Sequence, residues 1–204
     1  MLGTNGSDKI RIGASGEIGV AGAGSLNNGS VGQVLRSGGN SAGCMWVDQG
    51  ISDVDMWHLT SNFSGGADPI SSNLSEFSGH NFVQLGSGMS VSSGVFTFPK
   101  TGVWLVEFNR ETFLNGDDRE VRSFIQCTDD NSGFTSRTEN ANHISRSESQ
   151  NTHNQTYTMF VFDVENTSTH KVRFKVTTNN SSTNTIGTAN SARTWFKFTR
   201  LGDT

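Results

Sequence analysis

Residues 94–108, Gly-Val-Phe-Thr-Phe-Pro-Lys-Thr-Gly-Val-Trp-Leu-Val-Glu-Phe, constrain the fold of this chain more than any other stretch. Pro99 ends a short strand and Gly102 accommodates a reversal of the chain. After the turn, apolar side chains alternate with the period of a β-strand. Trp104, Val106 and Phe108 fall on one face, and Val103 and Leu105 fall on the other. A strand that is apolar on both faces is expected inside a sandwich or against another subunit.

Strand patterns recur along the chain, and no segment predicts a helix of three turns. They lie at residues 9–12, 17–20, 54–60, 82–85, 94–98, 103–114, 120–127, 157–165, 170–178 and 193–201. Turn residues at 99–102, 115–118 and 166–168 predict that the strands on either side pair as hairpins. Residues 129–155 are polar throughout and give the weakest pattern. Many short strands without helices favour an all-β jelly-roll sandwich.

The first 52 residues differ in composition from the rest of the chain. Of the 24 glycines, 13 lie within residues 1–50. The apolar patches there are too small to form a core, so this segment is expected to be an extended arm that orders on a partner. The candidate contact residues are Ile10, Ile12, Ile18 and Val20. We therefore expect an attachment arm at 1–52 and a folded head at 53–204.

Part of this arm resembles a segment of known proteins. Gly29, Gly32, Gln33, Val34, Leu35, Ser37, Gly38 and Trp46 match the pattern GxxGQVLxSxG…xW of phage tail-fibre and other virion appendage proteins. Cys44 and Met45 stand where that pattern has small residues or proline. The resemblance implies a virion structural protein, either a fibre or knob or a capsid decoration. It also implies that residues 1–52 anchor the chain to other virion proteins.

The head resembles a second family. Phe96-Thr97-Phe98-Pro99, Thr101 to Phe108, and Trp195-Phe196-Lys197-Phe198 are similar to aromatic signatures of the C1q/tumour-necrosis-factor-like family. The resemblance implies a jelly roll that assembles as a homotrimer, with the central and final strands near the three-fold axis. The residues expected at the trimer interface are Trp104, Phe108, Phe196 and Phe198.

An alternative function is a carbohydrate- or host-receptor-binding module that uses the distal loops to contact a host-surface glycan.

No catalytic or metal-binding constellation is apparent. Gly39-Asn40-Ser41-Ala42-Gly43 fits G-x-S-x-G, but that motif requires a preceding strand and a following helix, which the flanking sequence does not predict. The five histidines lack zinc-site spacing, and Asp117-Asp118 and Asp129-Asp130 fit ordinary turns better than calcium loops. We expect no enzymatic activity, metal or cofactor.

Composition limits the partners and the cell compartment. The net charge is −4 and the 15 basic residues are scattered, so nucleic acid is not an expected partner. No apolar run approaches the roughly 20 residues of a membrane span, and no signal peptide is apparent. Virion assembly after synthesis in the host cytoplasm is expected.

Cys44 and Cys127 are interpreted as inert thiols. Trp57, Trp104, Tyr157 and Trp195 are interpreted as packing residues rather than as surfaces that stack on sugars.

Overall fold

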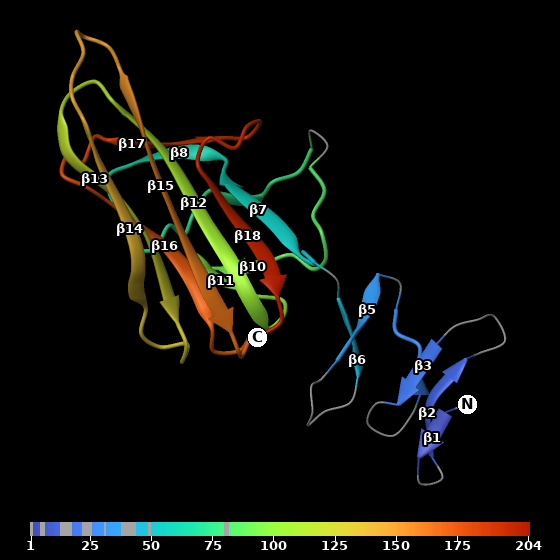
Figure 1. The fold of residues 1–204 in the computed structure, drawn as a ribbon. Coiled ribbons are helices and arrows are strands. Elements are labelled where there is room, and N and C mark those ends of the chain that lie inside the picture. The colour runs from blue at the N-terminus through green and yellow to red at the C-terminus, as the bar shows by residue number, and fades with distance from the viewer. Residues whose placement is uncertain are drawn as a thin grey trace. The chain divides into compact units, whose positions relative to one another are not determined.

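A computed structural model of the chain describes residues 2–4, 7–12, 18–21, 26–30, 32–37, 44–48, 50–79 and 82–204. The chain divides into two compact units, Met1–Gly50 and Ile51–Thr204. This division falls two residues before the expected boundary between residues 52 and 53. All regular secondary structure in the described ranges is β-strand, with no helix (Figure 1).

The described residues of the N-terminal unit form two small antiparallel sheets. One contains β1 (Leu2–Thr4), β2 (Ser7–Ile12), β3 (Ile18–Ala21) and β4 (Leu26–Asn27) in chain order, and the other pairs β5 (Gln33–Arg36) with β6 (Met45–Asp48). The strands predicted at 9–12 and 17–20 are present as β2 and β3. Gly29 has a φ of +72°, and a Cβ atom there would lie 2.6 Å from the Trp46 ring. Only glycine allows the ring to lie this close, which gives the glycine–tryptophan pattern a physical reason.

The head is a sandwich of two antiparallel sheets (Figure 1). One sheet has the order β8 (Ser61–Ser64), β17 (Asn184–Thr188), β12 (Gly102–Leu114), β18 (Trp195–Gly202), β7 (Val54–Leu59), β9 (Leu74–Glu76). In this sheet β18 and β17 pair one after the other with the same edge of β12, and β15 (Thr152–Val164) pairs with the opposite edge. The other has the order β10 (Ser90–Ser92), β11 (Val95–Thr97), β16 (Lys171–Thr178), β13 (Asp118–Thr128), β14 (Thr135–Ile144). This arrangement confirms the predicted all-β jelly roll.

The three turns predicted to form hairpins instead carry the chain from one sheet to the other. β11 pairs with β10 and β16, whereas β12 pairs with β15, β17 and β18. In the same way, β12 and β13 belong to different sheets, as do β15 and β16. The turn residues specify a reversal of the chain, but in a jelly roll the reversed strand joins the opposite sheet.

The sequence pattern missed β14 and the short strands β8, β9, β10 and β17, and it predicted one strand that is absent. Residues 129–155 contain β14, which the sequence pattern did not reveal because its side chains are exposed on both faces, apart from Thr138 and Ile144. Backbone pairing with β13 holds β14 in place. Conversely, residues 82–85 form no strand, and only the isolated bridges Val54↔Leu85 and Gly79↔Phe82 lie there. The Phe82 ring packs on Phe77, but Val83 is 77% exposed, so the segment lacks the alternating burial of a strand.

Aromatic rings from both sheets form the core of the head. Phe108 stacks on Phe196 with ring centroids 4.9 Å apart, and Phe174 of the opposite sheet lies 4.5 Å from Phe196. The expected trimer-interface residues, Trp104, Phe108, Phe196 and Phe198, are each at most 1% exposed. These side chains therefore form the interior of a single subunit and have no exposed surface with which to contact another. Alternation identified two faces of the strand but not which face turns inward.

An arginine is buried at one end of the sandwich. Arg110 on β12 is 0% exposed, and its Nε donates a hydrogen bond of 2.9 Å to Thr185 Oγ1 on β17. Its Nη1 donates one of 3.1 Å to the carbonyl oxygen of Arg122 on β13. Burial lowers the pKa of Arg110 to about 10, while Asp118 opposes this shift. The guanidinium thus links the two sheets where the aromatic core ends.

Replacing Arg110 by alanine should lower the free energy of unfolding by roughly 3 kcal/mol, because it leaves a cavity and removes hydrogen bonds from buried acceptors. Urea denaturation at one fixed protein concentration measures this. Arg137→Ala, which changes an exposed arginine on β14, serves as the control and should stay within about 0.5 kcal/mol of the wild type. Equal stability of the two variants would contradict the structural role given to Arg110.

Candidate functional site

The outward face of the seven-stranded sheet carries an apolar strip. We define it as Val103 and Leu105 on β12 together with Tyr157, Met159 and Val161 on β15. In the β12–β15 register Leu105 lies opposite Val161, and Asn109 lies opposite Tyr157. Tyr157, Met159 and Val161 are 42%, 57% and 52% exposed. Adjacent exposed apolar side chains on one face of a sheet are typical of a contact surface.

A small polar cluster lies within the apolar strip. The Tyr157 hydroxyl donates a hydrogen bond of 2.6 Å to Glu107 Oε1, and Lys197 Nζ lies 3.3 Å from Glu107 Oε2. The hydrogen bond to Glu107, with smaller effects of burial and charge, raises the pKa of Tyr157 to about 12. Lys197 balances the charge of Glu107, so the strip carries no unpaired carboxylate at its centre.

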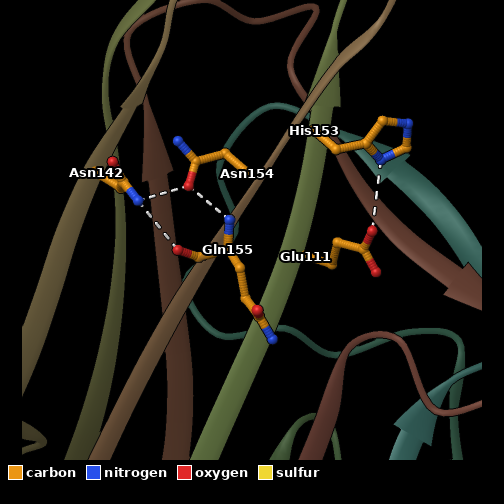
Figure 2. A pocket seen from close by; sticks show the side chains of 5 residues that line it. All are labelled: Glu111, Asn142, His153, Asn154 and Gln155. Atoms are coloured by element: carbon orange, nitrogen blue, oxygen red, sulfur yellow. Dashed lines mark hydrogen bonds and ion pairs between the residues drawn. The ribbon is translucent and has the colours of Figure 1, made fainter.

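A polar hollow of about 600 Å³ lies farther along the same two strands (Figure 2). Its lining residues are Glu111 on β12, Asn142 on β14, and His153, Asn154 and Gln155 on β15. His153 and Gln155 share the outward face of β15 with Tyr157, since residues two apart in a strand point the same way. The hollow therefore borders the apolar strip.

The amide side chains of the hollow are held by hydrogen bonds within the chain. Asn142 Nδ2 donates to Asn154 Oδ1 at 2.5 Å and to the carbonyl oxygen of Gln155 at 3.2 Å. Asn154 Oδ1 also accepts from the backbone N–H of Gln155 at 2.5 Å (Figure 2). The side-chain amides of Asn154 and Gln155 donate in turn to His143 O and Asn109 Oδ1. These contacts fix the amide planes relative to one another.

The carboxylate of the hollow is paired with a cation. Arg193 Nε donates to Glu111 Oε2 at 2.7 Å and Arg193 Nη2 donates to Glu111 Oε1, while His153 Nδ1 lies 3.4 Å from Glu111 Oε1. The hydrogen bonds from Arg193 lower the pKa of Glu111 despite its partial burial, and His153 adds a smaller effect in the same direction. The His153 ring packs on Phe113, with centroids 5.7 Å apart.

The candidate attachment residues of the arm lie together on one small sheet. Across β2 and β3, Ile10 lies opposite Val20, and Ile12 lies opposite Ile18. Ile12 is 69% exposed, Ile18 49% and Ile10 39%, whereas Val20 is 5% exposed. Three isoleucines thus offer apolar surface for a contact, and the contact itself stays a prediction.

The remaining candidate residues have local structural roles or lie outside the described ranges. Asp130 accepts hydrogen bonds from Thr128, Ser132 and Gly133, as expected of a turn, and these lower its pKa. Asp118 is buried and accepts from Asn179 N and Thr183 Oγ1. His80 and the Gly39–Gly43 motif fall in segments that are not described. The described ranges contain no group of three His, Cys, Asp or Glu residues that could hold a metal ion.

Both cysteines are free thiols, as predicted. Cys44 is exposed, whereas Cys127 is buried and burial raises its pKa to about 12. None of the described segments forms a helix long and apolar enough to cross a membrane.

Sequence reasoning did not find the strip or the hollow. The signal for the strip was present, because Tyr157, Met159 and Val161 alternate with Thr156 and Thr158. However, both threonines are buried and the apolar residues face outward, which reverses the usual arrangement. The hollow has no linear signature, since Glu111, Asn142 and Gln155 come from three strands.

Comparison with solved structures identifies the fold. The chain is similar to the Eiger TNF of S. frugiperda, with a TM-score of 0.55 and 12% identity over 76% of this chain and 96% of that chain. It is similar to murine APRIL in structures at pH 5.0 and pH 8.5, with TM-scores of 0.51 and 0.50, and identities of 11% and 10%. In both cases 73% of this chain and 98% of the other are covered. The head therefore has a tumour-necrosis-factor-like jelly-roll fold. No family model and no curated protein matches the sequence.

The pairing of Glu111 predicts a pH dependence. Because the folded-state pKa of Glu111 is lowered, its ionised form stabilises the fold above the pKa of the unfolded chain, and this stabilisation is lost as the pH falls through the folded-state pKa. Glu111→Gln should therefore be less stable than the wild type near neutral pH, and the difference should shrink as the pH falls below the ordinary glutamate pKa of about 4.3 and close below the lowered folded-state pKa. Unfolding followed by circular dichroism at a series of pH values measures it. The control is Glu165→Gln, which changes an exposed carboxylate and should have the stability of the wild type at every pH. A stability difference for Glu111→Gln that persists at low pH would contradict the pairing.

Proposed function

We propose that this chain is a structural protein of a virus particle, in which a homotrimeric jelly-roll head is anchored to other virion proteins by the arm at residues 1–52. The exposed apolar strip on β12 and β15 is the observation that supports the homotrimer. The glycine-rich pattern from Gly29 to Trp46 supports the virion setting through its resemblance to phage appendage proteins.

Two properties of the strip favour other copies of this chain as its occupants. Burying Tyr157, Met159 and Val161 removes apolar surface from water, which stabilises an assembly at about 25 cal/mol for each Å² buried. At the centre of the strip the charge of Glu107 is balanced, because Lys197 pairs with it inside the same subunit, while the exposed Asp163 lies opposite Val103 at one end of the strip. When identical surfaces meet around a rotation axis, unpaired like charges repel, and at the centre of the strip the charge of Glu107 is neutralised before contact. Three copies, the number that the resemblance of the head implies, can form a closed ring with three-fold symmetry.

The homotrimer can be tested by placing a charge in the strip. Met159→Asp should convert the trimer into a monomer at micromolar concentration, because each contact would bury a carboxylate without a partner. Light scattering coupled to size exclusion gives the mass directly. Val83→Asp changes an even more exposed apolar residue outside the strip and should remain trimeric. A monomeric wild type, or a trimeric Met159→Asp variant, would overturn the proposal.

The arm is proposed to supply the attachment through Ile10, Ile12 and Ile18. Their apolar side chains lie on paired strands, where they can pack against an apolar surface of a neighbouring virion protein. Val20 is buried and is expected to support the sheet from within.

Attachment is measured by adding purified full-length protein to particles that lack it. Ile12→Asp combined with Ile18→Asp should reduce particle binding by at least about tenfold, because both substitutions place charges where apolar contact is proposed. The Val83→Asp variant should bind as the wild type does. Unchanged binding of the double variant would mean that the head or another part of the arm carries the attachment.

A further inference from the structure

The chemistry of the polar hollow restricts the ligands that it can accept. Its one carboxylate, Glu111, already pairs with Arg193 and lies beside His153, so neither a free cation nor a free anion finds an unbalanced charge there. The lining includes no aliphatic side chain that would favour an apolar ligand. Amide, carboxylate and imidazole groups are what remain, and these exchange hydrogen bonds with hydroxyl groups.

The hydrogen-bonding groups of the hollow are pre-organised. Asn142, Asn154 and Gln155 hold one another through the contacts described above, so binding a ligand costs little side-chain ordering. Gln155 Nε2 is engaged by Asn109, which orients the Gln155 amide, while its Oε1 accepts no hydrogen bond from the described part of the chain. The internal contacts use both hydrogens of Asn142 Nδ2 and both lone pairs of Asn154 Oδ1. The groups left for neighbouring hydroxyl groups on a ring are Gln155 Oε1, the second hydrogens of the Asn154 and Gln155 amides, and the remaining lone pairs of the Glu111 carboxylate.

The size and walls of the hollow also fit a cyclic polyol. Its volume of about 600 Å³ lies within the range of roughly 300–1,000 Å³ that is usual for small-ligand sites. The His153 ring, supported by Phe113 at 5.7 Å, provides a flat surface beside the amides. We propose that the hollow formed by Glu111, Asn142, His153, Asn154 and Gln155 is a binding site for neutral saccharides.

The site is complete within one chain, so the proposal does not depend on the trimer. All five lining residues come from β12, β14 and β15 of a single subunit. Saccharide binding should therefore be retained by the monomeric Met159→Asp variant. Loss of binding on dissociation would overturn the claim that one chain suffices, and light scattering on the same samples separates this outcome from a failure of the proposed trimer.

The test is titration of the full-length protein with glucose, galactose, mannose and their disaccharides, followed by saturation-transfer NMR and calorimetry. We expect millimolar dissociation constants for at least one neutral sugar, as is usual when a few hydrogen bonds must offset the loss of ligand freedom. Asn142→Ala and Gln155→Ala should each weaken that binding by roughly tenfold. The matched control is Asn180→Ala, which removes an amide from a separate hollow lined by Asp117, Asp118, Arg119, Asn179, Asn180 and Ser181 and should leave binding unchanged.

Three results would overturn the proposal. The first is that no neutral sugar binds at millimolar concentration. The second is binding that survives both Asn142→Ala and Gln155→Ala at full strength while the variants remain folded by circular dichroism. The third is binding restricted to acidic sugars such as sialyllactose or heparin fragments, which would place the ligand on basic residues elsewhere on the head.

Discussion

The pairing of β12 along both of its edges is the constraint on which the rest of the head depends. One edge pairs with β15 from Gly102 to Leu114, and the other pairs with β18 and then with β17. A strand held in this way cannot slip by one residue without exchanging its two faces. The inward face can therefore be aromatic, with Trp104 and Phe108 in the core, while the outward face is free to carry functional groups.

Much of the strand content of the head could be predicted from the sequence, because strands with buried aromatic residues show a clear period of two. Residues 103–114 and 193–201 were found in this way and are present as β12 and β18. Strand partners could not be predicted. Asn115-Gly116 and the turn at 166–168 mark reversals, but the sheet that the returning strand joins depends on packing between distant segments. β14 was missed because a strand with exposed polar side chains on both faces has no period to detect.

The candidate surfaces were less predictable than the core. The aromatic residues were expected at the trimer interface because the head resembles a trimeric family, yet the second sheet covers the face with Trp104 and Phe108. The true outward residues of β15 alternate with Thr156 and Thr158, which are buried and hydrogen-bonded to Ser123 and Thr138 of the opposite sheet. Because these threonines are buried and hydrogen-bonded across the sandwich, the polar face of β15 points inward and its apolar face points outward. The sequence pattern alone suggests the reverse orientation.

The outward face of β12 changes character along its length, and this change separates the two proposed functions. Leu105 lies in the apolar strip, Glu107 pairs with Lys197 at the strip's centre, and Glu111 pairs with Arg193 in the hollow. Glu107 lies between Met159 on β15 and Lys197 on β18, so its pairing with Lys197 removes an obstacle to burial of the strip against another subunit. Glu111 lies among amides in an open hollow, where its pairing with Arg193 leaves no unbalanced charge to select a charged ligand. The two ion pairs thus serve different proposed functions four residues apart on one strand. The Glu107–Lys197 pair is compatible with self-association in the apolar strip, and the Glu111–Arg193 pair is compatible with recognition of hydroxyl groups in the polar hollow.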